Sequence, residues 1–260
     1  MRLAGETALV TGSTSGIGKG IALEFGREGA AVAVHGRNAE RGAAAVDEII
    51  KAGGEARFFA YDILDERACA DLVEAVHEWR SQLTVLVNNA VGGSLSGADT
   101  HDSKVGDMDT EHWESAIRMN MTAPMWLCRA AIPHMLAAGH GSIINVSTRQ
   151  AERPSAGLAA YAASKGGMNA LTRAIAVDYG RDGIRCNTIS PGYVINERRD
   201  AEITPERRER FEGMHLTRLG EARDIAHAAV YLASRESEYL TGINLQLDGG
   251  SSIARALTIG

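Results

Sequence analysis

Residues 11–18 read Thr-Gly-Ser-Thr-Ser-Gly-Ile-Gly and follow directly on a short apolar run at residues 8–11. The pattern predicts a strand that turns sharply into a helix. Gly12 permits the tight turn, Gly16 lets the backbone approach a pyrophosphate, and Gly18 lets the helix pack closely on a sheet. Free amide groups and the helix dipole favour phosphate at such a helix start. A glycine-rich turn without a ligand is the plainer alternative.

Outward from this loop, short apolar runs alternate with longer helical patterns. We expect strands at residues 8–11, 31–35, 57–61, 85–88, 142–146, 185–189 and 244–247. Helical patterns follow Asn38 as far as Gly53 and occupy residues 66–82, 110–138, 158–179 and 221–234. Continuous apolar strands are typical of sheets covered on both faces, and strand–helix alternation produces parallel pairing. The sequence therefore predicts a parallel α/β fold.

Length and composition restrict the class of protein. The chain has 260 residues without a repeat or a linker-like tract, so we expect one domain over residues 1–260. Its net charge of −6 does not favour nucleic acid or anionic lipid. We see no membrane span and no signal peptide. Cys69, Cys128 and Cys186 lack metal-ligand spacing, so we expect free thiols, a cytoplasmic location and no metal site.

Two segments interrupt the alternation of strands and helices. Residues 91–109 are rich in Gly, Ser and Asp, and residues 193–219 form a charged insertion after the sixth predicted strand. Because open α/β sheets bind ligands at the carboxyl ends of their strands, we expect a substrate lid at about 193–219. A solvated surface excursion is the alternative, and it is about equally plausible for the first segment.

The end of the second predicted strand indicates which dinucleotide binds. An acidic residue usually accepts the ribose hydroxyls of NAD there, but this chain has Gly36 followed by Arg37. A guanidinium can pair with a 2′-phosphate, which a carboxylate would repel. The sequence therefore favours NADP(H) over NAD(H), although Arg37 could also be an ordinary surface residue. Asp62 is placed to accept a bond from an adenine amino group.

Tyr161 and Lys165 are four residues apart in a predicted helix and so share one face. An ammonium group beside a phenol favours phenolate and lowers a pKa that is ordinarily about 10. Lowering it to near 7 requires about 4 kcal/mol, which Lys165 and a positive nicotinamide ring could supply. A tyrosine tuned in this way exchanges a proton with a hydroxyl at neutral pH.

Asn120 lies inside the predicted helix at 110–138, and Pro124 follows four residues later. The proline has no amide hydrogen, and its ring would clash with the Asn120 carbonyl. We expect a break in the helix that lets this carbonyl hold a water on a proton path. A simple kink is the alternative.

Together these motifs resemble the short-chain dehydrogenase/reductase family over residues 7–250. The resemblance also includes Asn88-Asn89-Ala90, Tyr161-Ala-Ala-Ser-Lys165, Asn187, Pro191-Gly192 and Asp248-Gly-Gly250. It implies a Rossmann-like, doubly wound parallel sheet of seven strands with helices on both faces, a nicotinamide cofactor and a homotetramer. The implied catalytic residues are Asn120, Thr148, Tyr161 and Lys165. The implied cofactor-binding residues are Gly12, Ser13, Thr14, Ser15, Gly16, Ile17, Gly18, Arg37, Asp62, Ile63, Asn89, Tyr161, Lys165, Pro191, Gly192, Val194 and Asn196.

The chain departs from the family pattern at three positions. Thr148 stands where the family has its catalytic serine, and Ser147 precedes it. Because successive strand residues face opposite sides, only one of the two can face the site. The family resemblance, through its spacing to Tyr161, implies that Thr148 faces the site and Ser147 faces away. Val91 replaces a glycine, and Asn196 replaces a threonine that contacts the carboxamide.

We therefore predict an NADP-dependent oxidoreductase that interconverts a secondary alcohol and a ketone, with Tyr161 as the acid/base. Residues 148–152 are similar to the same stretch of gluconate 5-dehydrogenases, and Arg149, Gln150, Glu152 and Arg153 would suit a sugar acid or polyol. The whole chain equally resembles 3-oxoacyl-carrier-protein reductases, so a 3-oxoacyl substrate stays open. The alternative function is a non-catalytic NADP-binding regulatory or scaffold module.

Overall fold

Seven parallel strands form the centre of the molecule, in the order β3-β2-β1-β4-β5-β6-β7. The computed structural model describes residues 1–91 and 102–254. The strands are β1 (Thr7–Val10), β2 (Ala31–His35), β3 (Glu55–Phe59), β4 (Val85–Asn88), β5 (Gly141–Val146), β6 (Ile184–Pro191) and β7 (Asn244–Leu247). The expected parallel sheet of seven strands is confirmed.

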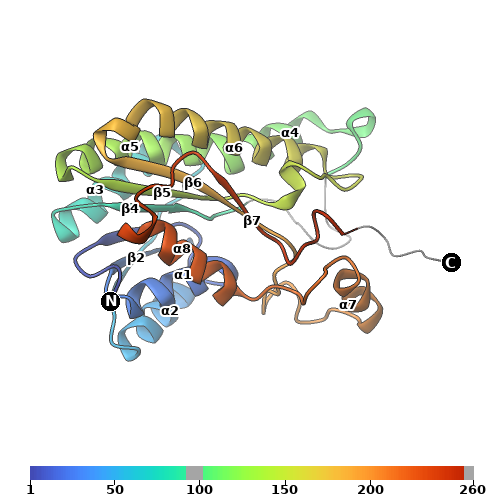
Figure 1. Ribbon diagram of the computed structural model, residues 1–260, viewed down its shortest axis with the longest axis horizontal. Coiled ribbons are helices and arrows are strands. Elements are labelled where there is room, and N and C mark those ends of the chain that lie inside the picture. The colour runs from blue at the N-terminus through green and yellow to red at the C-terminus, as the bar shows by residue number, and fades with distance from the viewer. Residues whose placement is uncertain (92–101, 255–260) are drawn as a thin grey trace.

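Helices cover both faces of this sheet (Figure 1). They are α1 (Gly16–Arg27), α2 (Ala39–Lys51), α3 (Glu66–Arg80), α4 (Thr110–Ile117), α5 (Ala123–Ala138), α6 (Ala159–Tyr179), α7 (Pro205–Glu212) and α8 (Ala222–Ala233). Helices α1, α2 and α8 lie on one face, and α3, α5 and α6 lie on the other. Helix α7 stands apart from both layers, beyond the end of β6. The fold is therefore doubly wound, as expected.

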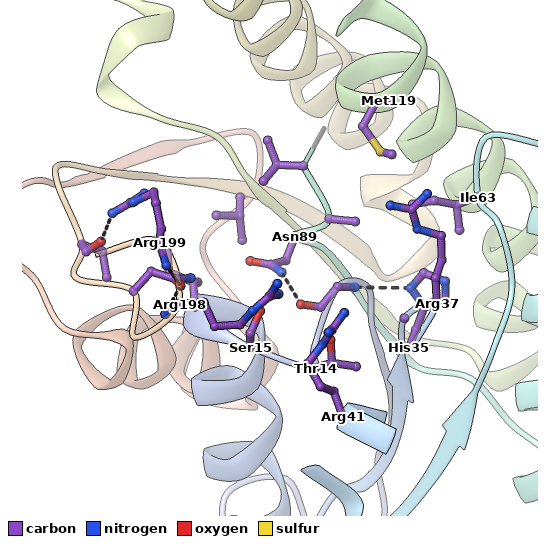
Figure 2. Close-up of a pocket in the computed structure, with 18 of the residues that line it drawn as sticks. Thr14, Ser15, His35, Arg37, Arg41, Ile63, Asn89, Met119, Arg198 and Arg199 are labelled. Atoms are coloured by element: carbon purple, nitrogen blue, oxygen red, sulfur yellow. Dashed lines mark hydrogen bonds between the residues drawn. The ribbon is translucent and has the colours of Figure 1, made fainter. Parts of the chain in front are cut away.

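The order of the strands reverses between β1 and β4, and this reversal positions the site. The chain passes from β1 outward to β3 and then returns to place β4 on the other side of β1. Loops that leave the carboxyl ends of neighbouring strands diverge at such a point and leave a crevice. Asn89, directly after β4, lies in this crevice beside the loop that follows β1 (Figure 2).

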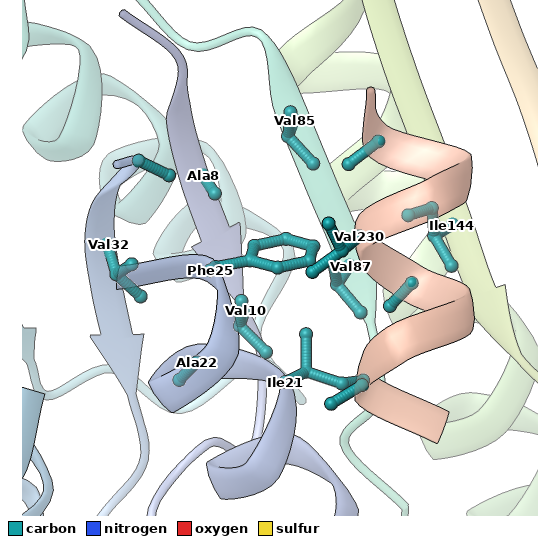
Figure 3. Close-up of a cluster of buried hydrophobic side chains, with 14 of the residues drawn as sticks. Ala8, Val10, Ile21, Ala22, Phe25, Val32, Val85, Val87, Ile144 and Val230 are labelled. Atoms are coloured by element: carbon teal, nitrogen blue, oxygen red, sulfur yellow. The ribbon is translucent and has the colours of Figure 1, made fainter. Parts of the chain in front are cut away.

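Alternating strand residues fill two separate cores. On β1, Ala8 and Val10 pack under α1 and α8, where Phe25 and Val230 are fully buried (Figure 3). Leu9, between them, belongs to the opposite core with α3 and α5. The interior strands are therefore apolar along their whole length, which explains why they were predictable as continuous runs.

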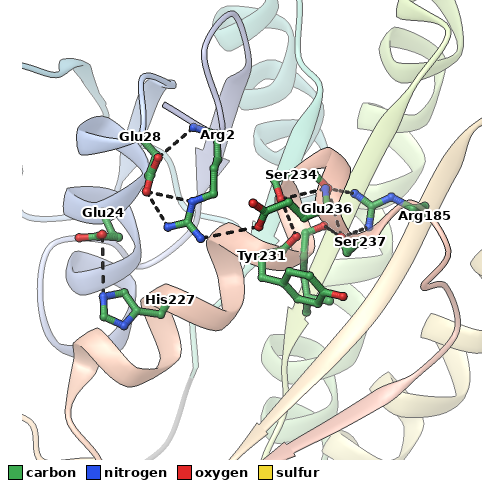
Figure 4. Close-up of polar contacts among 10 residues, drawn as sticks. Arg2, Glu24, Glu28, Arg185, His227, Tyr231, Ser234, Glu236 and Ser237 are labelled. Carbon is green, nitrogen blue, oxygen red and sulfur yellow. Dashed lines mark hydrogen bonds and ion pairs between the residues drawn. The ribbon is translucent and has the colours of Figure 1, made fainter.

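Polar contacts hold the amino terminus to the first core. The guanidinium of Arg2 pairs with Glu28 at the end of α1 and lies 3.8 Å from Glu236 after α8 (Figure 4). Arg185 on β6 donates to the hydroxyl of Ser237 at 2.8 Å and to the carbonyl of Ser234 at 3.1 Å. These contacts connect α1, β6 and the end of α8 at the edge away from the crevice.

The structure corrects several predicted boundaries. β3 ends at Phe59 rather than at residue 61, because it is an edge strand with one partly exposed face and no continuous apolar run. The break expected inside the helix predicted at 110–138 takes the form of a π-helical turn at Arg118–Thr122, in which the amide of Ala123 reaches the carbonyl of Arg118. Pro124, which has no amide hydrogen, explains the interruption.

The insertion at 193–219 contains a helix, α7, that the sequence analysis missed. Its start carries ordinary signals: the hydroxyl of Thr204 accepts from the amide of Arg207, and Pro205 occupies the first helical position. The other segment that interrupts the alternation of strands and helices, residues 91–109, lies partly outside the described residues. Within the part of the chain that the structure describes, no helix is long and apolar enough to cross a membrane.

Candidate active site

The glycine-rich loop needs its glycines for two different reasons. Gly12 and Gly16 have φ angles of +65° and +54°, which other residues rarely adopt. A Cβ atom at Gly18 would lie 2.3 Å from Nδ2 of Asn89. That amide donates to the carbonyl of Thr11 at 2.8 Å and to that of Gly12 at 3.3 Å. Asn89 therefore fixes the loop from β4, and the loop forms a cradle that a Cβ atom would fill.

His35, which the sequence analysis did not select, supports the same loop from β2. Its Nδ1 accepts from the amide of Gly12 at 3.3 Å, and its Nε2 contacts the carbonyl of Tyr61 at 3.1 Å. Burial lowers the pKa of His35, which favours the neutral ring that this bonding requires. Ser13 is also turned inward: its hydroxyl donates to Val10 and accepts from the amide of His35, so it does not line the cavity.

A cavity of about 340 Å³ opens from the loop along the end of β2 (Figure 2). Arg37 and Arg41 line it together with Asp62 and Ile63. A Cβ atom at Gly36 would lie 2.7 Å from the methyl group of Thr14. An acidic side chain at position 36 would therefore displace Thr14. Arg41, on α2, is a second guanidinium at this end that the sequence analysis missed.

Residues of the insertion close the same cavity from above. The carboxylate of Glu197 accepts from the amide of Gly16 at 3.1 Å, and the side chain of Asn196 lies against Gly16. Arg198, Arg199, Val194 and Asn196 line the cavity. The start of α1, predicted to bind pyrophosphate, thus holds a carboxylate of the chain itself in this structure.

Tyr161 lies where this first cavity meets a second one. The second cavity, of about 940 Å³, shares Ile17, Ser147, Tyr161, Val194 and Arg199 with the first. Thr148 lines the second cavity with Tyr161, and its side chain acts to lower the pKa of the phenol. The hydroxyl of Ser147 instead donates to the carbonyl of Lys165 at 3.4 Å. Ser147 does line the cavities, contrary to expectation, but its hydroxyl is turned away from Tyr161.

Lys165 is buried, and its ammonium donates to the carbonyl of Val146 at 2.8 Å. Burial lowers its pKa to about 7. Burial also raises the pKa of Tyr161 to about 12, against a smaller lowering by Thr148 and Arg199. Desolvation of the phenolate therefore dominates in this structure, and the lowering of the phenol pKa by Lys165 together with a nicotinamide ring stays a prediction.

Two further groups position the helix that bears Tyr161. Asn120, fully buried in the π-turn, donates to the hydroxyl of Ser164 at 3.1 Å. Asp102 accepts from the amides of Ala160 and Tyr161 at 3.1 and 2.9 Å, and so caps the start of α6. The sequence analysis missed Asp102 because it lies 59 positions before Tyr161.

The second cavity lies between the end of β5 and α7. Pro191 and Gly192 line one wall, Arg149 and Gln150 another, and Arg207, Arg210 and Phe211 line the α7 side. Glu152 and Arg153, expected to face the substrate, do not line it; Glu152 instead accepts from Asn244 at 2.5 Å. Gln150 is also engaged, since its side chain bonds both the amide and the hydroxyl of Ser155.

Comparison with known proteins matches this arrangement. A family model described as enoyl-(acyl carrier protein) reductase matches residues 12–252. The chain belongs to the short-chain dehydrogenase/reductase family. Among curated relatives, 7α-hydroxysteroid dehydrogenase of Clostridium sardiniense is 36% identical over 253 residues, which are 97% of this chain and 95% of the relative. The 3-oxoacyl-carrier-protein reductase of Chlamydia pneumoniae is 34% identical over 248 residues, covering 95% of this chain and 97% of the relative.

Solved structures of the family agree with the fold. A 7α-hydroxysteroid dehydrogenase in complex with NADH and 7-oxo glycochenodeoxycholic acid is 33% identical with a TM-score of 0.88, covering 96% of this chain and 95% of that one. A short-chain type dehydrogenase/reductase from Mycobacterium ulcerans is 30% identical with a TM-score of 0.90, covering 98% of this chain and 93% of that one. This short-chain dehydrogenase/reductase is thus an oxidoreductase of alcohol and carbonyl groups whose relatives use a nicotinamide cofactor.

Proposed function

We propose that this enzyme interconverts a secondary alcohol and a ketone with NADP(H), and that Tyr161 is its acid/base. The observation that carries the proposal is the place of Tyr161, which lines both cavities and shares the second with Thr148. A carbonyl group that enters the second cavity can meet the phenol and the threonine hydroxyl together.

The residues around the first cavity fit a dinucleotide. The cradle of Gly12, Gly16 and Gly18 is one that Cβ atoms would fill, and it lies at the start of α1. Residues Thr14, Ser15, Ile17, Asp62, Ile63, Asn89, Val194 and Asn196, which line this cavity, would hold the cofactor, with Pro191 and Gly192 at the junction with the second cavity. When bound, the nicotinamide supplies or accepts the hydride.

Arg37 and Arg41 favour NADP(H) over NAD(H). Both guanidiniums line the end of the cavity beside β2, where charge-assisted bonds to a 2′-phosphate would be available. Thr14 occupies the space that an acidic side chain at position 36 would need. The arrangement thus supplies the phosphate partner and has no carboxylate at position 36 to repel it.

The proton moves at the hydroxyl of Tyr161. In the reductive direction this hydroxyl donates its proton to the carbonyl oxygen, while the hydroxyl of Thr148 stabilises the negative charge that develops there. Because the pKa of Tyr161 is raised to about 12, the protonated form needed for reduction is favoured in this structure. Lys165 would bind the ribose and assist the phenolate in oxidation, and Asn120 would hold a relay water.

Substitution of Tyr161 tests the proposed acid/base directly. Tyr161→Phe removes the proton donor, so we expect turnover of ketones to vanish while NADPH binding, followed by fluorescence titration, is nearly unchanged. Persistent turnover would require another acid. If the wild-type protein binds the cofactor but turns over no alcohol or ketone, the regulatory or scaffold module is favoured.

Arg37→Gln with Arg41→Gln tests the choice of cofactor. Loss of a charge-assisted partner typically costs about 1.5–3 kcal/mol, or roughly tenfold or more in affinity. We expect that loss for NADPH and not for NADH. Equal wild-type affinities for the two cofactors would contradict the preference. Gly36→Asp would test the charge less directly, because its Cβ atom would also displace Thr14.

We also propose the higher-order features that the family resemblance implies. Residues 1–260 would act as one domain, with residues 193–219 as a substrate lid, since both cores share one sheet and α7 borders the second cavity. A homotetramer would cover exposed apolar side chains such as Val177 on α6, which is 82% exposed. A cytoplasmic location agrees with three free, buried cysteines. Light scattering tests the assembly.

A further inference from the structure

The second cavity has an apolar body and a cationic side. Its apolar lining includes Leu158, Tyr193, Phe211 and Met214, with the rings of Tyr193 and Phe211 stacked at 3.9 Å between centroids. Four guanidiniums line it as well, those of Arg149, Arg199, Arg207 and Arg210. Glu206 is the one carboxylate among its described lining residues. This excess of positive charge on one side indicates which kind of group on a substrate the cavity would bind.

One of these arginines is already neutralised. Arg199 pairs with Asp200 at 2.8 Å, donates to the carbonyl of Val194 at 2.7 Å and stacks over the ring of Tyr193. Its charge stabilises the insertion and is not available to bind a ligand without breaking that pair. Arg199 therefore shapes the junction beside Tyr161 rather than recognising an anion.

The other three arginines keep their charged ends available. Within residues 1–91 and 102–254, no hydrogen bond or ion pair engages the guanidinium of Arg149, Arg207 or Arg210, although Arg207 lies over the ring of Phe211 at 5.6 Å. No ion pair joins Glu206 to these arginines within the described residues; hydrogen bonding to its own backbone and to Thr204 lowers the pKa of its carboxyl instead. Arg149 follows β5 and the other two lie on α7, so the charges face the cavity from two elements.

We propose that this enzyme takes carbonyl and hydroxyl compounds that carry a carboxylate, and that Arg149, Arg207 and Arg210 bind that carboxylate. The proposal rests on the proposed function and names the substrate class of the same site. The reacting carbon lies beside Tyr161, an apolar spacer packs between Leu158 and Phe211, and the carboxylate meets the guanidiniums. A guanidinium fork binds a carboxylate through two parallel bonds, which gives orientation as well as affinity.

A series of methyl ketones tests this assignment. The probes are 4-oxopentanoate, 5-oxohexanoate, 6-oxoheptanoate and 7-oxooctanoate, each beside its primary amide, with NADPH oxidation as the readout. The series varies the distance from ketone to carboxylate while the amide removes only the charge. For the acid of best-fitting length we expect kcat/KM roughly tenfold or more above that of its amide. Amides that equal their acids at every length would overturn the proposal.

Variants on the cavity wall locate the effect. We expect Arg149→Gln with Arg210→Gln to reduce the acid-to-amide ratio toward one, mainly through KM. Arg208→Gln is the matched control, because Arg208 lies on the same helix but pairs with Glu212 at 2.9 Å and does not line the cavity. An acid preference that survives in the double variant, or is lost equally in Arg208→Gln, would overturn the assignment.

Two further arms separate the possible failures. Acetoacetyl-CoA carries its anionic groups as phosphates on the carrier. If the arginines were needed for turnover of this thioester and the keto acids were not turned over, the bound anion would be a carrier phosphate. That result would overturn the proposal. If neither acids nor amides are reduced, the proposed function fails. Calorimetric titration of 5-oxohexanoate and 6-oxoheptanoate against their amides into the NADP⁺-loaded protein then decides the carboxylate preference by itself.

Discussion

Thr148 and Ser147 are adjacent hydroxyl residues with different partners. Thr148 lines the second cavity with Tyr161 and lowers the pKa of the phenol, whereas the hydroxyl of Ser147 donates to the backbone carbonyl of Lys165. Chemical type alone would favour the serine as the catalytic hydroxyl. Spacing from Tyr161 favoured the threonine, and the bond of Ser147 to Lys165 leaves the Thr148 hydroxyl as the one we propose for catalysis. Individual hydroxyl groups can thus be assigned only when the partner of each is known.

At this scale we predict that Thr148→Ala loses about a hundredfold or more in turnover, because it removes a donor that stabilises charge on the carbonyl oxygen. Thr148→Ser should retain or raise activity, since it keeps the hydroxyl and removes a methyl group beside the substrate. Ser147→Ala is the control and should have a mild effect. Steady-state rates at saturating NADPH measure all three. A severe loss in Ser147→Ala beside near-normal Thr148→Ala would reverse the assignment.

Helix α6 depends on a cap supplied from outside it. Its N-cap residue, Leu158, offers no side-chain bond, and Asp102 instead accepts from the amides of Ala160 and Tyr161. Because one of these amides belongs to Tyr161 itself, the cap fixes the backbone that carries the phenol. Asp102 is therefore a positioning residue in the proposed reaction.

We predict that Asp102→Ala lowers the free energy of unfolding by about 1 kcal/mol, the usual value of a helix cap, and lowers kcat as well. Asp102→Asn should restore part of both, because its amide oxygen still accepts a bond. Hydrogen exchange at the amides of Ala160 and Tyr161 should quicken. Asp65→Ala, which removes the cap of α3 at the amide of Ala68, is the matched control. Equal loss of kcat in both variants would indicate a merely structural role.

The start of α1 illustrates a second interaction between elements. Glu197 occupies the amide of Gly16 at the position where a pyrophosphate would be favoured. The helix dipole stabilises a carboxylate at this position. The side chain of Glu197 would have to move away from the amide of Gly16 before a phosphate could bind there. The insertion and the cofactor therefore compete for one helix end.

We accordingly predict that Glu197→Gln binds NADPH about two- to fivefold more tightly, since interactions with a helix terminus are worth about 0.3–1 kcal/mol. The control is Glu202→Gln, an exposed carboxylate of the same insertion that does not line the cavity. Fluorescence titration at low and high salt measures the effect, which should shrink as salt rises. Weaker binding by Glu197→Gln would show that the carboxylate aids the cofactor.

On the scale of the whole molecule, the sequence was most informative where local pattern and tertiary structure coincide. Interior strands such as β2 and β4 were predictable because both of their faces are buried, and Tyr161 with Lys165 was predictable from one helical turn. The bounds of the edge strand β3, the cap from Asp102 and the Glu197 contact were not. Each depends on which distant segments become neighbours, and no local spacing encodes that.

The pH dependence of the whole fold gives a last prediction. His35 joins β2 to the loop after β1 and to Tyr61 after β3, and burial lowers its pKa below the ordinary value of about 6.5. The unfolded chain therefore takes up a proton below about pH 6.5, while the folded chain resists it. Below that pH, this group should lower the free energy of unfolding by at most about 1.4 kcal/mol per pH unit. Lys165, whose pKa burial lowers to about 7, adds a separate decline at higher pH that is largely complete by pH 6.5.

Urea denaturation at pH 7.5, 6.5 and 5.5 measures this decline. The carboxyl groups with lowered pKa values, such as those of Asp224 and Asp248, begin to lose their contribution only near pH 4 and below, so they do not act in this window. His35→Gln should be less stable at pH 7.5 and show a flatter profile, since the titrating ring is gone. NADPH affinity of the wild type should also decrease as the pH is lowered, because a protonated His35 ring cannot accept from the amide of Gly12. A wild-type stability that stays level from pH 6.5 to 5.5 would mean that the loop does not depend on a neutral His35.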